Sequence, residues 1–135
     1  MKVIRTTNLI PLNESKTRVL LLRTSLGDGQ PYKWTFPGQS MKKDENVEDI
    51  AQNLSKNILG TKTNKLIKFN TYESKTKNAV IKSHYFIGEI GNKVTLNDEK
   101  YIKAEWHTLN EEIFFLDFLH SEKDILSQVM EKTLK

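Results

Sequence analysis

The chain of 135 residues has the length of one ordinary domain and is long enough to enclose a single hydrophobic core. Apolar residues make up 37% and charged residues 28%, which is typical of globular proteins and excludes a disordered or membrane-embedded chain. The absence of cysteine excludes disulfides, thiolate metal sites and cysteine nucleophiles, and the net charge of +4 favours anionic ligands.

The first part of the chain predicts two neighbouring strands. Residues 2–12 and 17–25 form β-rich runs, and the turn-forming residues 13–16 separate them, which indicates a hairpin or an adjacent strand pair. The apolar block from Val19 to Leu22 indicates that the second strand is central in its sheet and covered on both faces.

The middle of the chain predicts a loop, a short strand and a helix. Residues 25–33 are rich in Gly, Asp and Pro and indicate a loop, whereas residues 34–38 indicate a short strand that ends in a turn. From Asn46 onwards the apolar residues follow helical spacing: Val47, Ile50, Ala51, Leu54 and Ile58. Carboxylates that favour a helix start lie at or before the first turn: Asp44, Glu45, Glu48 and Asp49. Gly60 is a natural stop for this helix.

The remainder predicts three strands and two helices. The strands lie at residues 64–74, 78–90 and 100–109. Residues 110–135 indicate one short and one longer helix. The longer helix has a buried side formed by Ile125, Val129 and, more loosely, Leu126 and Met130. The order of strands, helix, strands and helix, without a repeat or a linker, predicts a single α+β domain over residues 1–135, with a mixed sheet packed between helices.

Several of these pieces together resemble one protein family. They are "RVLLLRTS", "WTFPG", the acidic helix start, and "NDEKYIKAEWHTL" followed by a terminal helix, and they span nearly the whole chain. In this order and spacing the chain resembles a Nudix hydrolase domain. The resemblance implies a Nudix-like α/β/α sandwich with a mixed β-sheet, a nucleotide-like phosphate ligand, and a homodimer as a possible assembly.

In that family the Nudix box supplies the metal site. It runs Gly, five residues, Glu, seven residues, then Arg-Glu-apolar-x-Glu-Glu-x-Gly. Its loop carbonyl and helix glutamates hold Mg²⁺ or Mn²⁺, which bridges the diphosphate oxygens and activates a water. Here Pro37 and Gly38 match the loop, Gln39 stands where a second glycine is usual, and Glu45 matches the first glutamate.

The second half of the box lacks its carboxylates. A frame set by Glu45 places the Arg-Glu and Glu-Glu positions on Asn53-Leu54 and Asn57-Ile58. A frame one residue earlier, set by Leu54, places them on Gln52-Asn53 and Lys56-Asn57. In either frame the box is degenerate, and from residue 50 through residue 72 the sequence contains no Asp or Glu. Because a divalent metal needs several anionic oxygen ligands, the usual Mg²⁺ or Mn²⁺ site is predicted to be absent.

The candidate acidic residues lie outside the helix body. Glu45 and Glu99 are the catalytic candidates, since a loop glutamate at the place of Glu99 acts as general base in some Nudix enzymes. Glu45 and Glu48 are the metal-ligand candidates, if a metal binds at all. The alternative for each is an ordinary role, as an exposed loop acid or a carboxylate that interacts with the helix dipole.

The candidate substrate-binding residues are Arg23, Trp34, Gly38, Gln39 and Lys56. The resemblance places Arg23 near the substrate's phosphates, and the Lys56 ammonium stands where the family has a carboxylate, so it is able to contact a phosphate directly. Trp34 is a candidate for stacking on a nucleobase, whereas the aromatic residues Tyr85, Phe86 and Trp106 are expected in the core. The alternatives are a surface arginine, an ordinary turn glycine and a solvent-facing lysine.

Other classes of site are not indicated. The histidines lack ligand spacing: His84, His107 and His120. The lysines are spread along the chain without a dense basic block, and no nucleic-acid module stands out, so a nucleic acid is not indicated as a partner. No apolar run approaches the length that crosses a bilayer, and the N-terminus lacks a signal-peptide core, so we expect a cytoplasmic protein with no membrane partner.

Three functions remain open from the sequence. The first is a Nudix hydrolase-like domain that binds a nucleoside diphosphate derivative or related phosphate compound, with metal-dependent pyrophosphohydrolase activity weak, altered or lost. The second is an active Mg²⁺-dependent pyrophosphohydrolase with non-standard metal ligands. The third is a regulatory or protein-interaction domain on the same fold.

Overall fold

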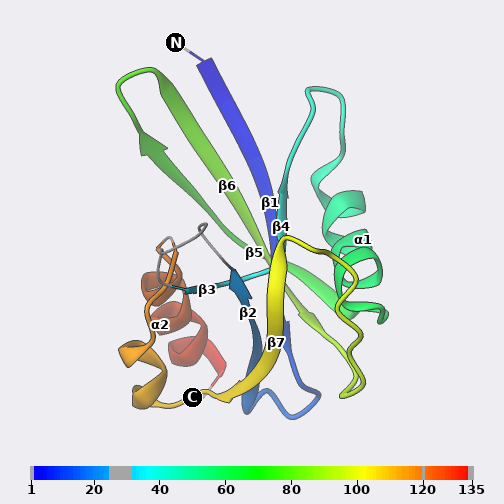
Figure 1. Ribbon diagram of the computed structural model, residues 1–135. Coiled ribbons are helices and arrows are strands. Elements are labelled where there is room, and N and C mark those ends of the chain that lie inside the picture. The colour runs from blue at the N-terminus through cyan, green and yellow to red at the C-terminus, as the bar shows by residue number, and fades with distance from the viewer. Residues whose placement is uncertain (1, 25–31, 120, 134–135) are drawn as a thin grey trace.

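The computed structural model describes residues 2–24, 32–119 and 121–133 (Figure 1). Most of the loop predicted at residues 25–33 lies outside the described residues, and so does His120. The strands are β1 (Lys2–Leu12), β2 (Arg18–Thr24), β3 (Lys33–Thr35), β4 (Gly38–Ser40), β5 (Asn64–Lys75), β6 (Ala79–Glu89) and β7 (Tyr101–Thr108). The helices are α1 (Val47–Leu59), the 3₁₀ helix η1 (Glu111–Phe115) and α2 (Glu122–Thr133).

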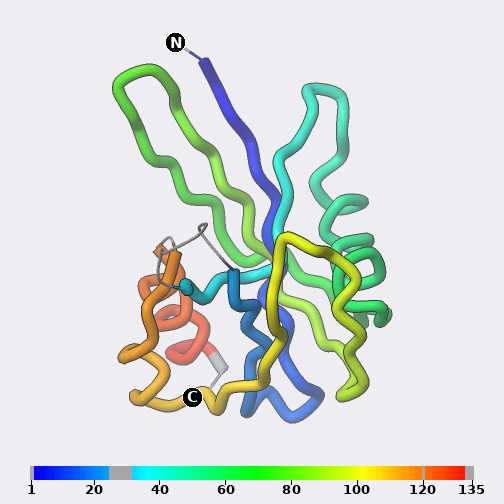
Figure 2. The backbone as a smooth tube through the Cα atoms, viewed as in Figure 1, coloured from blue at the N-terminus to red at the C-terminus, as the bar shows by residue number. Residues whose placement is uncertain are grey.

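The strands form one mixed, seven-stranded sheet. Its order is β3-β2-β1-β6-β5, while β4 also pairs with β1 and β7 also pairs with β2. β1 and β6 run parallel, with Lys2 opposite Ala79 at one end and Leu12 opposite Glu89 at the other. The other pairs are antiparallel. Figure 2 traces β1 and the β5–β6 hairpin as a long projection that extends beyond both helices.

The sheet separates two hydrophobic cores. Side chains alternate along β2, so Leu20 and Leu22 pack with α1 on one face, and Val19 and Leu21 pack with α2 on the other. All four are buried, which confirms the prediction of a central strand covered on both faces. The mixed sheet between helices confirms the predicted α+β sandwich (Figure 1).

Helix α1 has well-formed ends. The Asn46 side chain accepts hydrogen bonds from the backbone N–H groups of Glu48 (2.9 Å) and Asp49 (3.1 Å), which satisfies two otherwise free donors. At the other end, Gly60 adopts a left-handed conformation with φ of 62°, and its N–H donates to the Ser55 carbonyl. Both the acidic first turn and the glycine stop agree with the sequence prediction.

Strand β4 was not predicted as a strand. The sequence at residues 34–38 indicates a turn after β3, yet Gly38–Ser40 pairs with β1, with Asn8 opposite Gly38. The strand has only three residues, its Gln39 and Ser40 are exposed, and it shows no alternation of apolar and polar residues. It is therefore recognised as a strand only through its pairing with β1. In the described part of the chain, no helix is long and apolar enough to cross a membrane.

Candidate functional site

Helix α1 contains the positions to which the family resemblance assigns the metal ligands. The buried residues of the helix are Ile50, Ala51, Leu54, Ser55, Ile58 and Leu59. A frame set by Glu45 would therefore place ligand positions on the core residues Leu54 and Ile58, whereas the frame set by Leu54 places them on exposed side chains. Those exposed side chains are Gln52, Asn53, Lys56 and Asn57. The packing of the helix favours the Leu54 frame.

This outer face is neutral to basic. Lys56 and Lys62 line a shallow pocket of about 590 Å³, together with Gln52, Asn53, Gly60 and Thr61. The Gln52 amide donates to the Thr63 carbonyl at 3.1 Å, so one of the polar side chains already has a partner. With no carboxylate in this lining, the pocket suits an anion and not a divalent cation.

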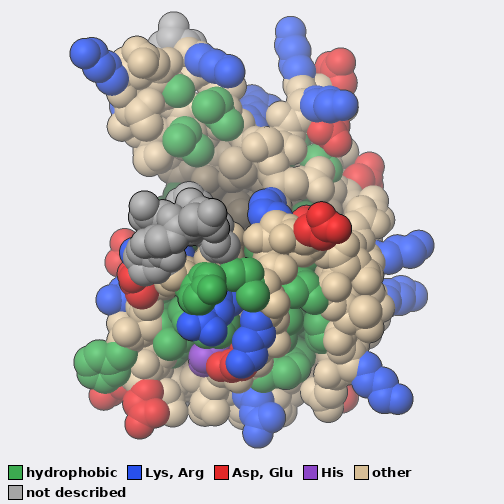
Figure 3. Space-filling model, in the orientation of Figure 1, with side chains coloured by type: hydrophobic (Ala, Val, Ile, Leu, Met, Phe, Trp, Pro, Cys, Tyr) green, Lys and Arg blue, Asp and Glu red, His purple; other side chains and the backbone are tan. Residues whose placement is uncertain are grey.

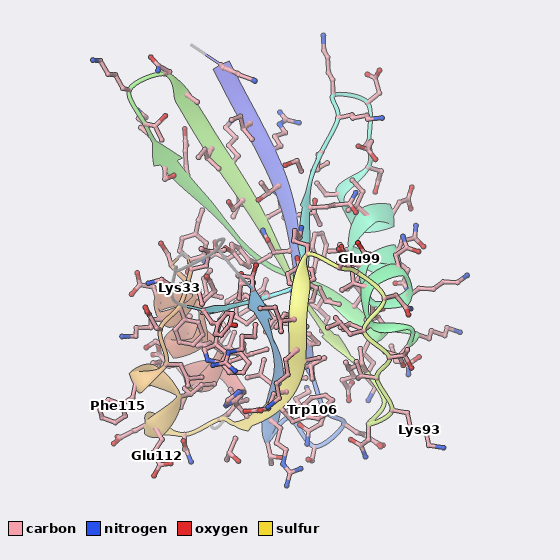
Figure 4. The ribbon with its side chains drawn as sticks, viewed as in Figure 1. Lys33, Lys93, Glu99, Trp106, Glu112 and Phe115 are labelled. Carbon is pink, nitrogen blue, oxygen red and sulfur yellow. The ribbon has the colours of Figure 1, made fainter. Side chains whose placement is uncertain are left out.

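The candidate acids lie apart from one another. Glu45 closes a turn ahead of α1: its carboxylate accepts from the Lys42 N–H at 2.7 Å, and its own N–H donates to the Lys42 carbonyl at 3.2 Å. Glu48 is exposed in the first turn of α1. Glu99 is exposed in the turn that leads into β7, as Figure 4 shows. Among the described residues, no group of three or more His, Cys, Asp or Glu is placed to hold a metal ion.

Gly38 and Gln39 lie in a small pocket at the centre of the molecule, which we call the central pocket. Its volume is about 220 Å³, and Lys100 and Tyr101 also line it. The Tyr101 hydroxyl makes a long hydrogen bond of 3.5 Å to the Gly38 carbonyl, the oxygen that the family resemblance assigns to the metal. A Cβ atom at position 38 would lie in steric conflict with the Asn8 amide oxygen, so a larger residue here would force the Asn8 side chain to move.

A second pocket, the α2-side pocket, adjoins the central pocket. It has a volume of about 330 Å³, and Thr6 and Asn8 of β1 line both pockets. Its other lining residues come from β1, β5, β6 and the residue before α2, and they mix apolar and hydroxyl groups: Ile4, Tyr72, Ile81, Ser83, Tyr85 and Ser121. We take the two neighbouring pockets together as one candidate site, with one apolar, hydroxyl-rich end and one end that carries a lysine.

Two tyrosines give the α2-side pocket its aromatic wall. Tyr72 and Tyr85 meet edge to face, with 5.7 Å between ring centroids. The Tyr72 hydroxyl oxygen is buried and has no hydrogen-bond partner among the described residues, so a polar ligand atom there would satisfy it. Burial raises the pKa of Tyr85 far above its ordinary value, with a further contribution from Glu122, so its hydroxyl stays protonated.

Arg23 and Trp34 form a separate cluster on the sheet face opposite α1. They lie opposite each other on β2 and β3, with the guanidinium carbon 5.6 Å from the centre of the Trp34 ring and 4.6 Å from that of Tyr32. The edge of His107 packs on Trp34, with 4.8 Å between centroids. Figure 3 shows basic, histidine and acidic side chains gathered together and bordered by hydrophobic ones. Trp34 is thus largely engaged by neighbours within the fold.

Charged neighbours surround His107 on β7. Its Nε2 lies 3.2 Å from a carboxylate oxygen of Glu105, although not in hydrogen-bond geometry, and Lys103 pairs with the same carboxylate at 2.7 Å. Burial lowers the pKa of His107, and the opposing effect of Glu105 is smaller. The hydrogen bond from Lys103 lowers the pKa of Glu105. His107 is therefore mainly neutral near pH 7.

The candidates from the sequence thus fall into separate groups. Gly38 lies with Gln39, Arg23 lies with Trp34, and Lys56 lies on the outer face of α1. The sequence reasoning missed most of the residues that line the two neighbouring pockets, among them Thr6, Asn8, Tyr72, Ser83, Lys100 and Tyr101. One signal in the sequence could have indicated two of them. Thr6 and Asn8 stand at alternate positions of the first strand and interrupt its apolar face.

Comparison with known proteins addresses the fold. No family model matches the sequence, and no curated protein matches it. Among solved structures, the Escherichia coli ORF135 protein is 16% identical with a TM-score of 0.80, over 97% of this chain and 91% of that one. The MutT protein from Methanosarcina mazei is 19% identical with a TM-score of 0.76, over 99% and 97%. The MutT Nudix hydrolase from Burkholderia pseudomallei is 13% identical with a TM-score of 0.77, over 96% and 99%.

The chain has the Nudix fold. The likeness extends over nearly all of both chains, so the fold implied by the sequence resemblance is confirmed. At these identities the comparison concerns the fold, and the chemistry of the site depends on the side chains present. In this Nudix fold, the outer face of α1 presents Gln52, Asn53, Lys56 and Asn57.

Proposed function

We propose that this Nudix-fold domain binds a nucleoside diphosphate derivative or a related phosphate compound, with metal-dependent pyrophosphohydrolase activity weak, altered or lost. The observation that carries the proposal is the pair of neighbouring pockets, the central pocket and the α2-side pocket, which share the lining residues Thr6 and Asn8. A ligand with an apolar ring at one end and anionic groups at the other matches the two ends of this site.

The α2-side pocket suits the nucleoside. Tyr72 and Tyr85 provide aromatic surface, Ile4 and Ile81 provide aliphatic surface, and Ser83 provides a hydroxyl for the polar edge of a base. The unpartnered Tyr72 hydroxyl adds a donor in the same wall.

The central pocket suits the phosphates. Gly38 has no side chain, so a ligand is able to approach the backbone, and the Gln39 amide supplies further donors. The Lys100 ammonium, 4.9 Å from the centre of the Tyr101 ring, supplies a positive charge. Hydrogen bonds from charged donors to phosphate oxygens are the stronger kind, so Lys100 is expected to contribute most to phosphate affinity.

The donor set does not fit Mg²⁺ or Mn²⁺. From residue 52 onwards the exposed positions of α1 carry amides and a lysine, and among the described residues Glu45, Glu48 and Glu99 do not form a group placed to hold a metal ion. Neutral amides and an ammonium provide no anionic oxygen for a hard divalent cation. We therefore propose no metal-dependent step at these positions.

Thermal unfolding with nucleotides tests the binding. A panel of ADP, ADP-ribose and a dinucleoside polyphosphate is added with EDTA, and separately with Mg²⁺ or Mn²⁺. A ligand at about a hundred times its Kd is expected to stabilise the fold by about 2.7 kcal/mol, and EDTA should not abolish the effect. The variant Lys100→Gln should weaken this stabilisation by the ligand. The control variant Lys93→Gln should leave it unchanged, because Lys93 lies away from the Glu99–Lys100 turn on the β6–β7 connection (Figure 4).

Phosphate release from the same panel tests the loss of catalysis. Metal-dependent release that is lost in Glu45→Gln would contradict the proposal and favour an active enzyme with non-standard ligands. If no member of the panel stabilises the protein and none is cleaved, the interaction-domain alternative is favoured.

A further inference from the structure

The α2-side pocket contains a hydroxyl group that the fold leaves unpaired. Tyr72 on β5 lines this pocket, and its hydroxyl oxygen is buried without a hydrogen-bond partner among the described residues. A buried polar group without a partner costs free energy, and native proteins contain few such groups. A ligand atom that pairs with the Tyr72 hydroxyl would offset this cost.

The register of the sheet places Tyr72 at the end of a row of hydroxyl residues. Ser40 of β4 lies opposite Thr6 of β1. Ser83 of β6 lies opposite Thr6 on one side and opposite Tyr72 on the other. Thr6 lines both pockets, and neighbouring strands are about 4.8 Å apart. Tyr72 thus lies two strands away from a residue that the two pockets share, on the side of the site that suits the nucleoside.

The surroundings of Tyr72 suit a neutral, flat ring. The Tyr72 ring meets that of Tyr85 edge to face, with 5.7 Å between centroids, and Ile4 and Ile81 add aliphatic surface to the same pocket. None of the described residues that line this pocket is charged. Apolar surface favours a ring, whereas the unpaired hydroxyl favours a polar atom. A nucleobase combines the two, because polar atoms lie along the edge of its aromatic ring.

We propose that Tyr72 is a specificity-determining residue, whose hydroxyl requires a polar atom on the edge of the ligand's ring. The inference rests on the proposed function, because it concerns the nucleoside end of the same site. A ring of the same shape with an apolar edge would leave the hydroxyl unpaired, and binding sites reject such analogues strongly. A tyrosine hydroxyl both donates and accepts, so it excludes apolar rings without choosing among the natural bases.

Titration calorimetry in EDTA measures this preference. The ligands are ADP, GDP, UDP and benzimidazole riboside 5′-diphosphate, which keeps the shape of a purine nucleotide but has no polar atom on its six-membered ring. The wild-type chain should bind at least one of the three natural nucleotides about tenfold or more tightly than the benzimidazole nucleotide, because only the latter leaves the Tyr72 hydroxyl unpaired.

The variant Tyr72→Phe keeps the ring and removes only the hydroxyl. It should reduce the ratio between the two affinities by about tenfold, because the benzimidazole nucleotide no longer buries an unpaired group. The control variant Tyr32→Phe removes a hydroxyl from an exposed tyrosine beside Arg23 and should leave the ratio unchanged. Without ligand, Tyr72→Phe should keep or raise the melting temperature, because the hydroxyl that it removes has no partner among the described residues.

Two results would overturn this inference and leave the proposed function standing. One is nucleotide binding with the same affinity ratio in Tyr72→Phe as in the wild type. The other is a loss of equal size for all four ligands, together with a melting temperature of the free variant several degrees below that of the wild type, which would show that the hydroxyl is structural. If the wild-type chain binds none of the four ligands, the proposed function fails, and this inference fails with it.

Discussion

Gly60 ends α1 in a conformation that other residues adopt at a cost. Its φ of 62° is left-handed, and an added Cβ would approach both the Thr95 carbonyl and the Asn97 side chain to 3.2 Å. Gly60→Ala is therefore expected to lower the free energy of unfolding by about 1–2 kcal/mol, and Gly60→Asn by less, because asparagine tolerates this region. Urea unfolding measures both variants. An alanine variant as stable as the wild type would contradict this reading of the helix stop.

His107 makes the stability depend on pH. Burial holds its pKa below the ordinary value of 6.5, so as the pH falls the unfolded chain takes up a proton before the folded one does. Stability contributed by the neutral ring is present above that value and is lost as the pH falls towards the lower pKa of the folded state. Glu105 and Lys103 face the ring, and the depressed pKa of Glu105 removes stability only at still lower pH.

The variant His107→Gln removes this titration. Its free energy of unfolding, measured in urea at about pH 7.5 and about pH 5.5, should fall less between the two values than that of the wild type. His84→Gln is the matched comparison, because burial also lowers the pKa of His84 and the sign of its effect is the same. A pH dependence unchanged by either substitution would show that other groups determine it.

At the scale of an element, substitutions on the outer face of α1 test the proposed absence of a metal site. The variant Asn53→Glu, Lys56→Glu, Asn57→Glu restores carboxylates three and four residues apart in the frame set by Leu54. Without metal it should be slightly less stable, since each like-charge pair costs about 0.2–0.5 kcal/mol. Added Mg²⁺ should raise its melting temperature, whereas the wild type should not respond.

A glutamine triple at the same three positions is the control. It keeps the size of the side chains and lacks their charge, so Mg²⁺ should leave its melting temperature unchanged. A wild-type chain that responds to Mg²⁺ as strongly as the acidic variant would overturn the conclusion that its donor set does not fit the metal.

Elements whose apolar residues recur at a regular spacing were predictable from the sequence, whereas a strand held only by its pairing with another strand was not. Helix α1 follows from its apolar spacing, from Asn46 and the acidic first turn, and from Gly60, because these are local properties of the chain. Strand β4 has no such period, and it exists because β1 offers hydrogen-bond partners along Thr6–Asn8. The box frame was also undecided until the burial of Leu54 and Ile58 was known.

At the scale of the whole molecule, the sheet keeps the two cores independent. Leu54 belongs to the core beneath α1, and Ile125 belongs to the core beneath α2. Leu54→Ala should cost about 2–5 kcal/mol and Ile125→Val about 0.5–1.5 kcal/mol. Leu54 and Ile125 belong to different clusters. The two losses in free energy of unfolding should therefore add to within about 0.5 kcal/mol in the double variant, as measured by urea unfolding. A larger deviation would show that strain passes through the sheet.

The sites depend on tertiary structure more than the elements do. The central pocket joins Gly38 to Lys100 and to Asn8, and the pairing of β1 with β6 joins Arg5 to Lys82, across long separations in the sequence. The basic residues look evenly spread along the chain, so the sequence does not indicate which of them are neighbours. The strand register then places two of these cations side by side.

The sequence by itself determined the α+β class, the ends and the apolar stripe of α1, the burial of the central strand, and the lack of carboxylates in α1 from residue 50 onwards, because each of these follows from local spacing and composition. Only the tertiary structure decided which frame of the box the packing of α1 favours, where β4 pairs, and which distant side chains meet in the pockets. The physical reason is that a pocket is formed by strand register and packing, and these depend on residues far apart in the chain.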